Sequence, residues 1–232
     1  MNSNNNDMAT TKQKTREEVR NENIEATVSK TEQFFNENQK TIWGVLAAIL
    51  VVGLAILAYG KFIYGPKCAE AMAAMYPAET SFQAGEFELA LSGDGNVPGF
   101  EQVIEEYGAK AGKSVYMYAG ICELQLGNFE SAISYLKKYK GRDAILAARA
   151  IACQGDAYVG LGDYSSAVRC FRAAAAKADN VFAAGYLLKE GLALEKLGDK
   201  AGALNAYRTI EDKYPQSLEA YDIRRYISAV EE

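Results

Sequence analysis

The stretch LGDYSSAVRCF, Leu161–Phe171, has two close relatives in the same chain. LGNFESAISYL precedes it at Leu126–Leu136, and LGDKAGALNAY follows it at Leu197–Tyr207. Successive stretches lie 35 and 36 residues apart. A repeat of about this length is typical of helical hairpins that stack into a solenoid, because one hairpin alone cannot bury its apolar face. These three stretches therefore decide the fold.

Each repeat keeps the same kinds of residue at fixed places. A central glycine suits the left-handed end of a first helix, and the Asn or Asp after it can cap the second helix. Another glycine seven residues earlier and an alanine five residues later predict close approach of the paired helices, since glycine alone is costly inside a helix. A bulky residue nine positions after the central glycine should fill the space between neighbouring units. In chain order these positions are Gly120, Gly155 and Gly191; Gly127, Gly162 and Gly198; Asn128, Asp163 and Asp199; Ala132, Ala167 and Ala203; Leu136, Phe171 and Tyr207.

The repeats predict an all-α fold with an α-solenoid over residues 65–232. An off-period segment, Ser92–Phe100, is rich in turn residues and is predicted to be a loop. Ser217 can cap a last helix whose charged side chains suit the solvated end of the stack. The expected boundaries are about 67–110 for a degenerate first unit, about 113–146, 148–181 and 184–217 for three repeats, and 217–230 for a capping helix.

A run of twenty uncharged residues, Thr41–Gly60, precedes the repeats. As a helix it would span roughly 30 Å, the thickness of the hydrocarbon core of a bilayer. Trp43 and Tyr59 lie near its two ends, where aromatic rings suit the membrane interface. A cleaved signal peptide would place a shorter apolar run nearer the N-terminus. We therefore predict a transmembrane signal-anchor helix over residues 41–64.

Residues 1–40 are predicted to form a cytoplasmic tail. Residues 1–15 are polar and rich in Asn, which predicts disorder. Residues 16–38 have helical character, and this segment is expected to be a juxtamembrane helix or, alternatively, a docking helix for a membrane partner. Lys and Arg are more frequent before the apolar run than just after it, so the C-terminal domain is expected on the far side of the membrane.

Several function classes lack support in this composition. The chain has no His, its four Cys show no CxxC spacing, and it has no nucleotide-binding glycine motif, so we expect no metal, no cofactor and no enzyme activity. A net charge of -5 without a basic stripe disfavours nucleic acid. Cys122, Cys153 and Cys170 are expected to pack in the core. A Cys122–Cys153 disulfide remains an open alternative at this point.

The repeats resemble the tetratricopeptide repeat. Two positions depart from that pattern, because Glu123 and Lys200 stand where an aromatic residue is usual. Pro215 stands where the terminal proline of a repeat is usual. The positions of the second repeat that match are Gly155, Tyr158, Gly162, Tyr164, Ala167, Phe171 and Ala174.

The resemblance implies a concave groove lined by the first helix of each pair. Its aliphatic patches would suit apolar peptides, although the same side chains could instead pack within the solenoid. A carboxylate clamp found in some members is not expected, because Met117, Ile121 and Cys153 stand at three of its positions. The predicted groove residues are Met117, Ile121, Leu124, Gln125, Arg149, Asp156, Val159, Leu188, Lys189, Leu192, Glu195 and Lys196.

The whole layout is similar to that of the ancillary subunits of the bacterial SecYEG translocon (YfgM-like). The phrase EQFFNENQK, Glu32–Lys40, stands directly before the apolar run as a similar phrase does in that family. The resemblance implies a single-pass protein of the bacterial inner membrane with a periplasmic repeat domain. Its partners would be a SecYEG-like translocon and a membrane-anchored periplasmic chaperone of the prolyl-isomerase type. The alternative is a scaffold for another envelope complex, in outer-membrane assembly or secretion.

Overall fold

The computed structural model describes residues 16–231, which contain helices and no β-strand. The chain divides into two compact units, Met1–Lys61 and Phe62–Glu232. The tail predicted to be disordered, residues 1–15, lies outside the described residues. The all-helical prediction is therefore confirmed for the described part of the chain.

The first unit contains one long helix, α1 (Arg16–Tyr59), which is followed by a π-helical turn, Gly60–Tyr64. Within the described residues, the helical stretch Glu37–Ala84 is long and apolar enough to cross a membrane. Its most apolar window has a mean hydropathy of 2.6, and no residue of that window is buried in the protein. A helical window this apolar, with none of its residues buried, is a candidate membrane span by length and composition.

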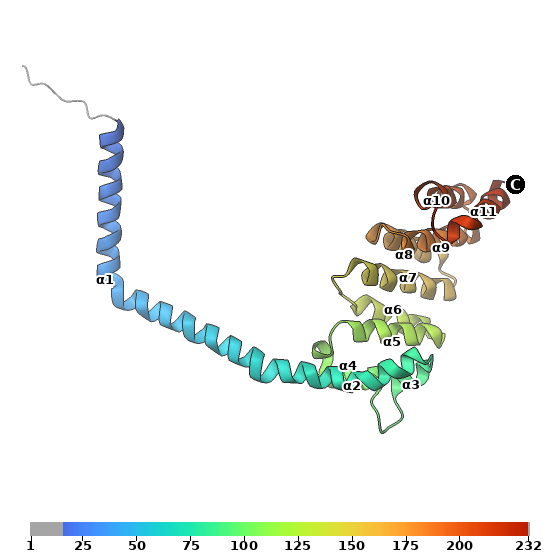
Figure 1. The fold of residues 1–232 in the computed structure, drawn as a ribbon, viewed down its shortest axis with the longest axis horizontal. Coiled ribbons are helices and arrows are strands. Elements are labelled where there is room, and N and C mark those ends of the chain that lie inside the picture. The colour runs from blue at the N-terminus through green and yellow to red at the C-terminus, as the bar shows by residue number, and fades with distance from the viewer. Residues whose placement is uncertain (1–15, 232) are drawn as a thin grey trace, which may run out of the picture. The chain divides into compact units, whose positions relative to one another are not determined.

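The second unit contains three helical hairpins, which Figure 1 shows as successive layers of one stack. Each helix packs against the next one along the chain. In each hairpin a longer or equal first helix is joined to its partner by a tight turn, as the repeat spacing predicts. The hairpins are α5 (Ser114–Gln125) with α6 (Phe129–Lys138), α7 (Ala144–Gly160) with α8 (Tyr164–Lys177), and α9 (Phe182–Lys196) with α10 (Lys200–Lys213).

A less regular group of helices precedes the hairpins. Asp94 orders the loop within it, because its carboxylate accepts hydrogen bonds from the backbone N–H groups of Asn96 and Val97 at 2.9 and 2.8 Å. The ring of Phe100 stacks on that of Tyr118, with centroids 5.4 Å apart, and so joins this group to α5. The elements are α2 (Gly65–Gln83), α3 (Phe87–Ser92), α4 (Phe100–Tyr107) and a 3₁₀ turn, Gly108–Ala111.

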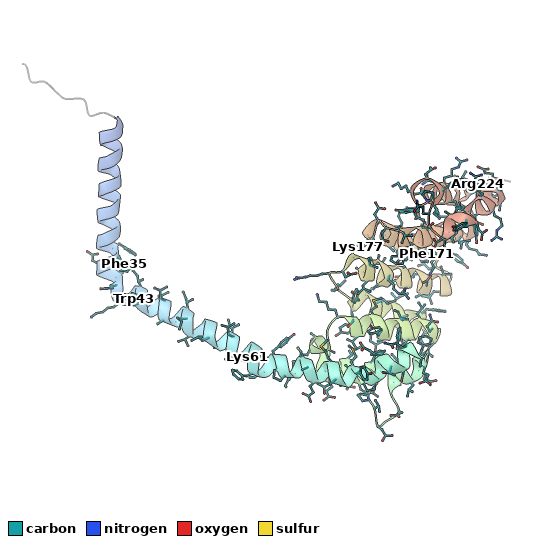
Figure 2. All side chains as sticks on the ribbon, in the orientation of Figure 1. Phe35, Trp43, Lys61, Phe171, Lys177 and Arg224 are labelled. Carbon is teal, nitrogen blue, oxygen red and sulfur yellow. The ribbon has the colours of Figure 1, made fainter. Side chains whose placement is uncertain are left out.

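The stack ends in a short helix, α11 (Ile223–Glu231), which follows a 3₁₀ turn, Glu219–Tyr221. The Ser217 hydroxyl accepts a hydrogen bond from the Ala220 backbone at 3.3 Å. Ser217 therefore caps the turn, and the continuous helix predicted over 217–230 is replaced by a turn and a shorter helix. Arg224, labelled in Figure 2, is exposed on α11, as expected for a solvated end of a solenoid.

The turn glycines adopt the left-handed backbone that their spacing predicts, with φ of +81° at Gly127, +74° at Gly162 and +77° at Gly198. The carboxylates of Asp163 and Asp199 then accept backbone hydrogen bonds from the first turns of α8 and α10, at 3.0 and 2.8 Å.

The capping prediction is wrong for Asn128. Its side chain makes no capping bond to α6. Instead, the side-chain amide donates a hydrogen bond to the carboxylate of Glu123, at 2.8 Å. Glu123 is only 6% exposed, and a buried carboxylate needs a donor, so it takes the amide away from the helix.

The buried glycines seat a large side chain from the second helix of the same hairpin. A methyl group at Gly155 would lie 2.5 Å from the Phe171 ring, and one at Gly191 would lie 2.2 Å from the Tyr207 ring. Close approach of the paired helices is therefore confirmed. Phe171 and Tyr207 also belong to one hydrophobic cluster that continues through α9 to α11, so they pack both within and between hairpins. The three pairs are Gly120–Leu136, Gly155–Phe171 and Gly191–Tyr207.

Candidate functional site

A hollow of about 210 Å³ opens between α7 and α9. Its floor includes the ring of Phe171, which is labelled in Figure 2 and is nearly fully buried. Val159 and Leu192 line it while remaining 39% and 41% exposed. A cavity of about 150 Å³ can hold benzene, so this hollow has room for one large apolar side chain. Its lining residues are Asp156, Val159, Tyr164, Phe171, Lys189, Leu192, Ala193 and Lys196.

The hollow contains five of the predicted groove residues, from the second and third repeats. Asp156 and Val159 come from α7, and Lys189, Leu192 and Lys196 come from α9. The prediction missed Ala193 on α9, and it also missed Tyr164 and Phe171, because it drew the groove from first helices only. Both lie on α8, and the signal for them was available: they stand at the aromatic positions of the repeat pattern.

An ion pair crosses the rim of the hollow. The Lys189 ammonium donates to both carboxylate oxygens of Asp156 at 2.8 Å, and it lies 5.8 Å from the centre of the Phe171 ring. Both side chains are partly exposed, so the pair adds little to stability. The pair matters more for the character of the hollow than for stability. It links neighbouring repeats and neutralises two charges at the rim, so the remaining lining is mainly apolar.

Glu195 does not face the hollow as a free carboxylate. It accepts a hydrogen bond from the hydroxyl of Tyr207 on α10. Burial of the Tyr207 ring, followed by this hydrogen bond, raises the pKa of Tyr207, so the phenol stays a neutral donor. The carboxylate is thereby held against the second helix of its own hairpin.

The first repeat contributes little exposed surface to the predicted wall. Met117 and Ile121 are 7% and 8% exposed and form a buried cluster with Leu136 and Ala150. A ligand in the groove would not reach them, because α7 packs over this part of α5. Leu124 is half-buried and Gln125 is exposed.

The remaining two predicted groove residues differ in exposure. Arg149 is exposed on α7, one helical turn before Cys153. Leu188 is half-buried and packs against the hydrophobic cluster that contains Tyr207. Leu188 therefore serves the core, which is the alternative role that the sequence left open for such side chains.

Comparison with known proteins identifies the type of repeat in the second and third hairpins. Residues 154–217, from the middle of α7 to the end of the third hairpin, match the family model of the tetratricopeptide repeat. The helical repeats are of the tetratricopeptide type. No curated protein gave a match. The crystal structure of MamA protein is similar, with a TM-score of 0.55 and 20% sequence identity, and the likeness covers 72% of this chain and 84% of that chain. At this identity the likeness shows the fold alone.

The first hairpin contains a buried carboxylate, Glu123, at a position where the repeat pattern predicts an aromatic residue. Glu123 is held by Asn128, as described above, and its charge contributes to raising the pKa of Tyr135, after burial and the nearby carboxylate of Glu101. The carboxylates of Glu123 and Glu101 do not form part of a metal site. Among the described residues, no group of three or more His, Cys, Asp or Glu side chains is placed to hold a metal ion.

The cysteines of the repeat domain are free thiols, so the Cys122–Cys153 disulfide that the sequence left open is not formed. Cys122 is fully buried, whereas Cys153 and Cys170 are half-buried. Burial raises the pKa of Cys122 to about 12 and that of Cys153 to about 11. It also raises the pKa of Cys170. The core position expected for Cys122 agrees with this environment.

These pKa shifts predict slow thiol chemistry. Because a raised pKa lowers the thiolate fraction at pH 8, and burial blocks access, Cys122 should react with iodoacetamide at least about 100-fold more slowly in the folded protein than in urea. Mass spectrometry of the alkylated peptides measures both rates. Similar rates in the two conditions would show that Cys122 is accessible and that the packing around it is misassigned.

Proposed function

We propose that this chain is a membrane-anchored protein-binding scaffold, and that the hollow between α7 and α9 receives an apolar segment of a partner protein. Tetratricopeptide repeats generally bind proteins, which supports a binding role over catalysis. The observation that carries the proposal is the hollow itself, which is lined by apolar side chains from two neighbouring repeats, among them Val159, Leu192 and Phe171.

The lining residues indicate what kind of segment would fit. Val159, Leu192 and the Phe171 ring supply apolar lining to the hollow. The Lys189–Asp156 pair is already neutralised, whereas Lys196 adds a positive charge at the rim. The best match is a segment that inserts one large apolar side chain and carries an acidic residue beside it.

The membrane part of the proposal is supported by the candidate span, since Thr41–Tyr64 lies within the apolar helical stretch and stays exposed in the protein. The distribution of Lys and Arg supports a cytoplasmic N-terminus and a periplasmic repeat domain. The phrase Glu32–Lys40 supports a place beside a SecYEG-like translocon in a bacterial inner membrane. There the hollow would receive secreted chains and assist their transfer to a membrane-anchored chaperone of the prolyl-isomerase type.

Photocrosslinking in native membranes tests the proposal. A photoreactive residue in place of Leu192 should capture a partner protein several-fold more often than one in place of Leu197. Leu192 lies on α9 and Leu197 directly follows its last residue; they are 41% and 49% exposed, but only Leu192 lines the hollow. Leu197 is therefore a matched control for exposure.

The identity of the captured protein separates the parts of the proposal. Translocon components or a periplasmic chaperone would support the accessory role. Components of an outer-membrane assembly or secretion complex would keep the binding hollow and replace the translocon with another envelope complex. Equal capture from both positions would mean that the hollow is not the binding site.

A further inference from the structure

One edge of the repeat stack exposes large apolar side chains in successive repeats. We call it the connecting edge, and it comprises residues 137–146, 177–182 and 213–221, where a second helix ends and the next unit begins. Leu146, Phe182 and Leu218 lie 36 residues apart and are 45%, 55% and 83% exposed. The other exposed apolar residues there are Ile145, Val181 and Tyr221, at 43%, 56% and 84%.

The three segments form one continuous edge. Ala148, Ala178 and Ala184 share a buried cluster, which brings together the start of α7, the end of α8 and the start of α9. The hydroxyl of Tyr214 donates a hydrogen bond to the carboxylate of Asp179, which joins the second and third segments. The exposed apolar residues therefore follow one side of the stack rather than scattered sites.

Charge distinguishes this edge from the opposite one. Four basic residues fall within residues 137–142, KKYKGR, and Lys177, labelled in Figure 2, ends α8 on the second segment. These lysines and Arg142 stand out in a chain whose net charge is -5. Single acidic residues, Asp143, Asp179 and Glu219, leave the connecting edge positive on balance.

The opposite edge, formed by the turns within the hairpins, has comparable leucines and the opposite charge. Leu126, Leu161 and Leu197 are 40%, 40% and 49% exposed. Two of them are followed, after one glycine, by Asp163 and Asp199. Apolar exposure is thus common to both edges, and although Lys196 and Lys200 flank Leu197 on the opposite edge, the run of four basic residues at 137–142 belongs to the connecting edge.

We propose that the connecting edge lies on the surface of a bilayer that contains anionic phospholipids. Lys and Arg are attracted to anionic headgroups, and exposed aliphatic and aromatic side chains enter the interface between headgroups and acyl chains. This proposal rests on the membrane anchor of the proposed function, because a domain tethered to a bilayer meets its surface at high effective concentration. An apolar patch of this extent needs a partner, and its positive charge matches the surface of an anionic bilayer.

Hydrogen exchange of the full chain in nanodiscs tests the proposal. The discs contain phosphatidylcholine alone or phosphatidylcholine mixed with phosphatidylglycerol. We expect exchange in peptides of the connecting edge to slow about fivefold in the anionic discs, and to recover at high salt because surface electrostatics are screened. Peptides covering Leu126, Leu161 and Leu197 should exchange equally in both discs.

Two sets of substitutions probe the two contributions. The variant K138Q/K140Q/R142Q should lose the protection by removing charge, and the variant L146S/F182S/L218S should lose it by removing apolar contact. The variant Leu161→Ser changes an equally exposed leucine on the opposite edge and should keep the protection. Circular dichroism and the melting temperature of each variant show whether the repeats remain folded.

The outcomes separate this inference from the proposed function. If α1 is not protected in either disc, the membrane anchor itself is wrong. If α1 is protected but the connecting edge exchanges equally in both lipids, only the lipid contact is wrong. If the connecting edge is already protected in neutral discs and can be crosslinked there to a protein, including a second copy of the chain, the lipid contact is also wrong.

Discussion

Phe171→Ala is expected to lower the free energy of unfolding by about 3–5 kcal/mol. The Phe171 side chain is 1% exposed and belongs to the hydrophobic cluster that extends from α7 to α11. Its ring fills the space above Gly155, so truncation would leave a cavity that neither helix can close without breaking the hairpin contacts. Urea denaturation of the full chain in detergent, followed by circular dichroism, measures the loss.

A substitution on the same helix provides the control. Lys177 is exposed at the end of α8, so Lys177→Ala should change the free energy of unfolding by no more than about 0.5 kcal/mol. A loss below about 1 kcal/mol for Phe171→Ala would contradict the packing of the second repeat described here.

Gly191→Ala should lower the free energy of unfolding by about 2 kcal/mol, although alanine is the better helix former. The reason is steric, because the added methyl group would lie 2.2 Å from the Tyr207 ring. Tyr207 is fully buried and its hydroxyl is bonded to Glu195, so the ring has little freedom to move aside. The same denaturation experiment measures this loss.

A double-mutant cycle isolates the steric contact. In a Tyr207→Ala background, Gly191→Ala should become neutral or stabilising by up to about 1 kcal/mol, since only helix propensity then remains. Gly185→Ala on the same helix is a second control, because its methyl group would meet only the flexible end of Glu219, at 3.0 Å. If Gly191→Ala costs the same in both backgrounds, the ring of Tyr207 is not the cause.

Features that recur at the same position of successive hairpins could be predicted from the sequence. The turn at Gly162 and the seat of Phe171 on Gly155 involve residues that are close along the chain and recur at a fixed period. For such pairs, a glycine or alanine that recurs in every repeat predicts that a large side chain packs against it.

Features that depend on packing between hairpins, or on one residue that departs from the repeat pattern, could not be predicted in the same way. Met117 and Ile121 occupy groove positions by spacing, yet they are buried, because their exposure depends on how α7 packs over α5. Glu195 was assigned to the groove, but Tyr207 is the one residue at its repeat position with a hydroxyl, and that hydroxyl needs an acceptor. Asn128 likewise binds Glu123 instead of capping α6, and the repeat spacing does not predict that Glu123 is buried.

The position of the Phe171 ring restricts how recognition could diversify among related chains. Since Phe171 belongs to the hydrophobic core and also lines the hollow, a change at Phe171 would alter folding together with the shape of the hollow. Val159, Leu192 and Lys196 also line the hollow, but they are exposed and contribute less to the hydrophobic core. New specificities would therefore arise by varying these outer positions while the aromatic floor stays fixed.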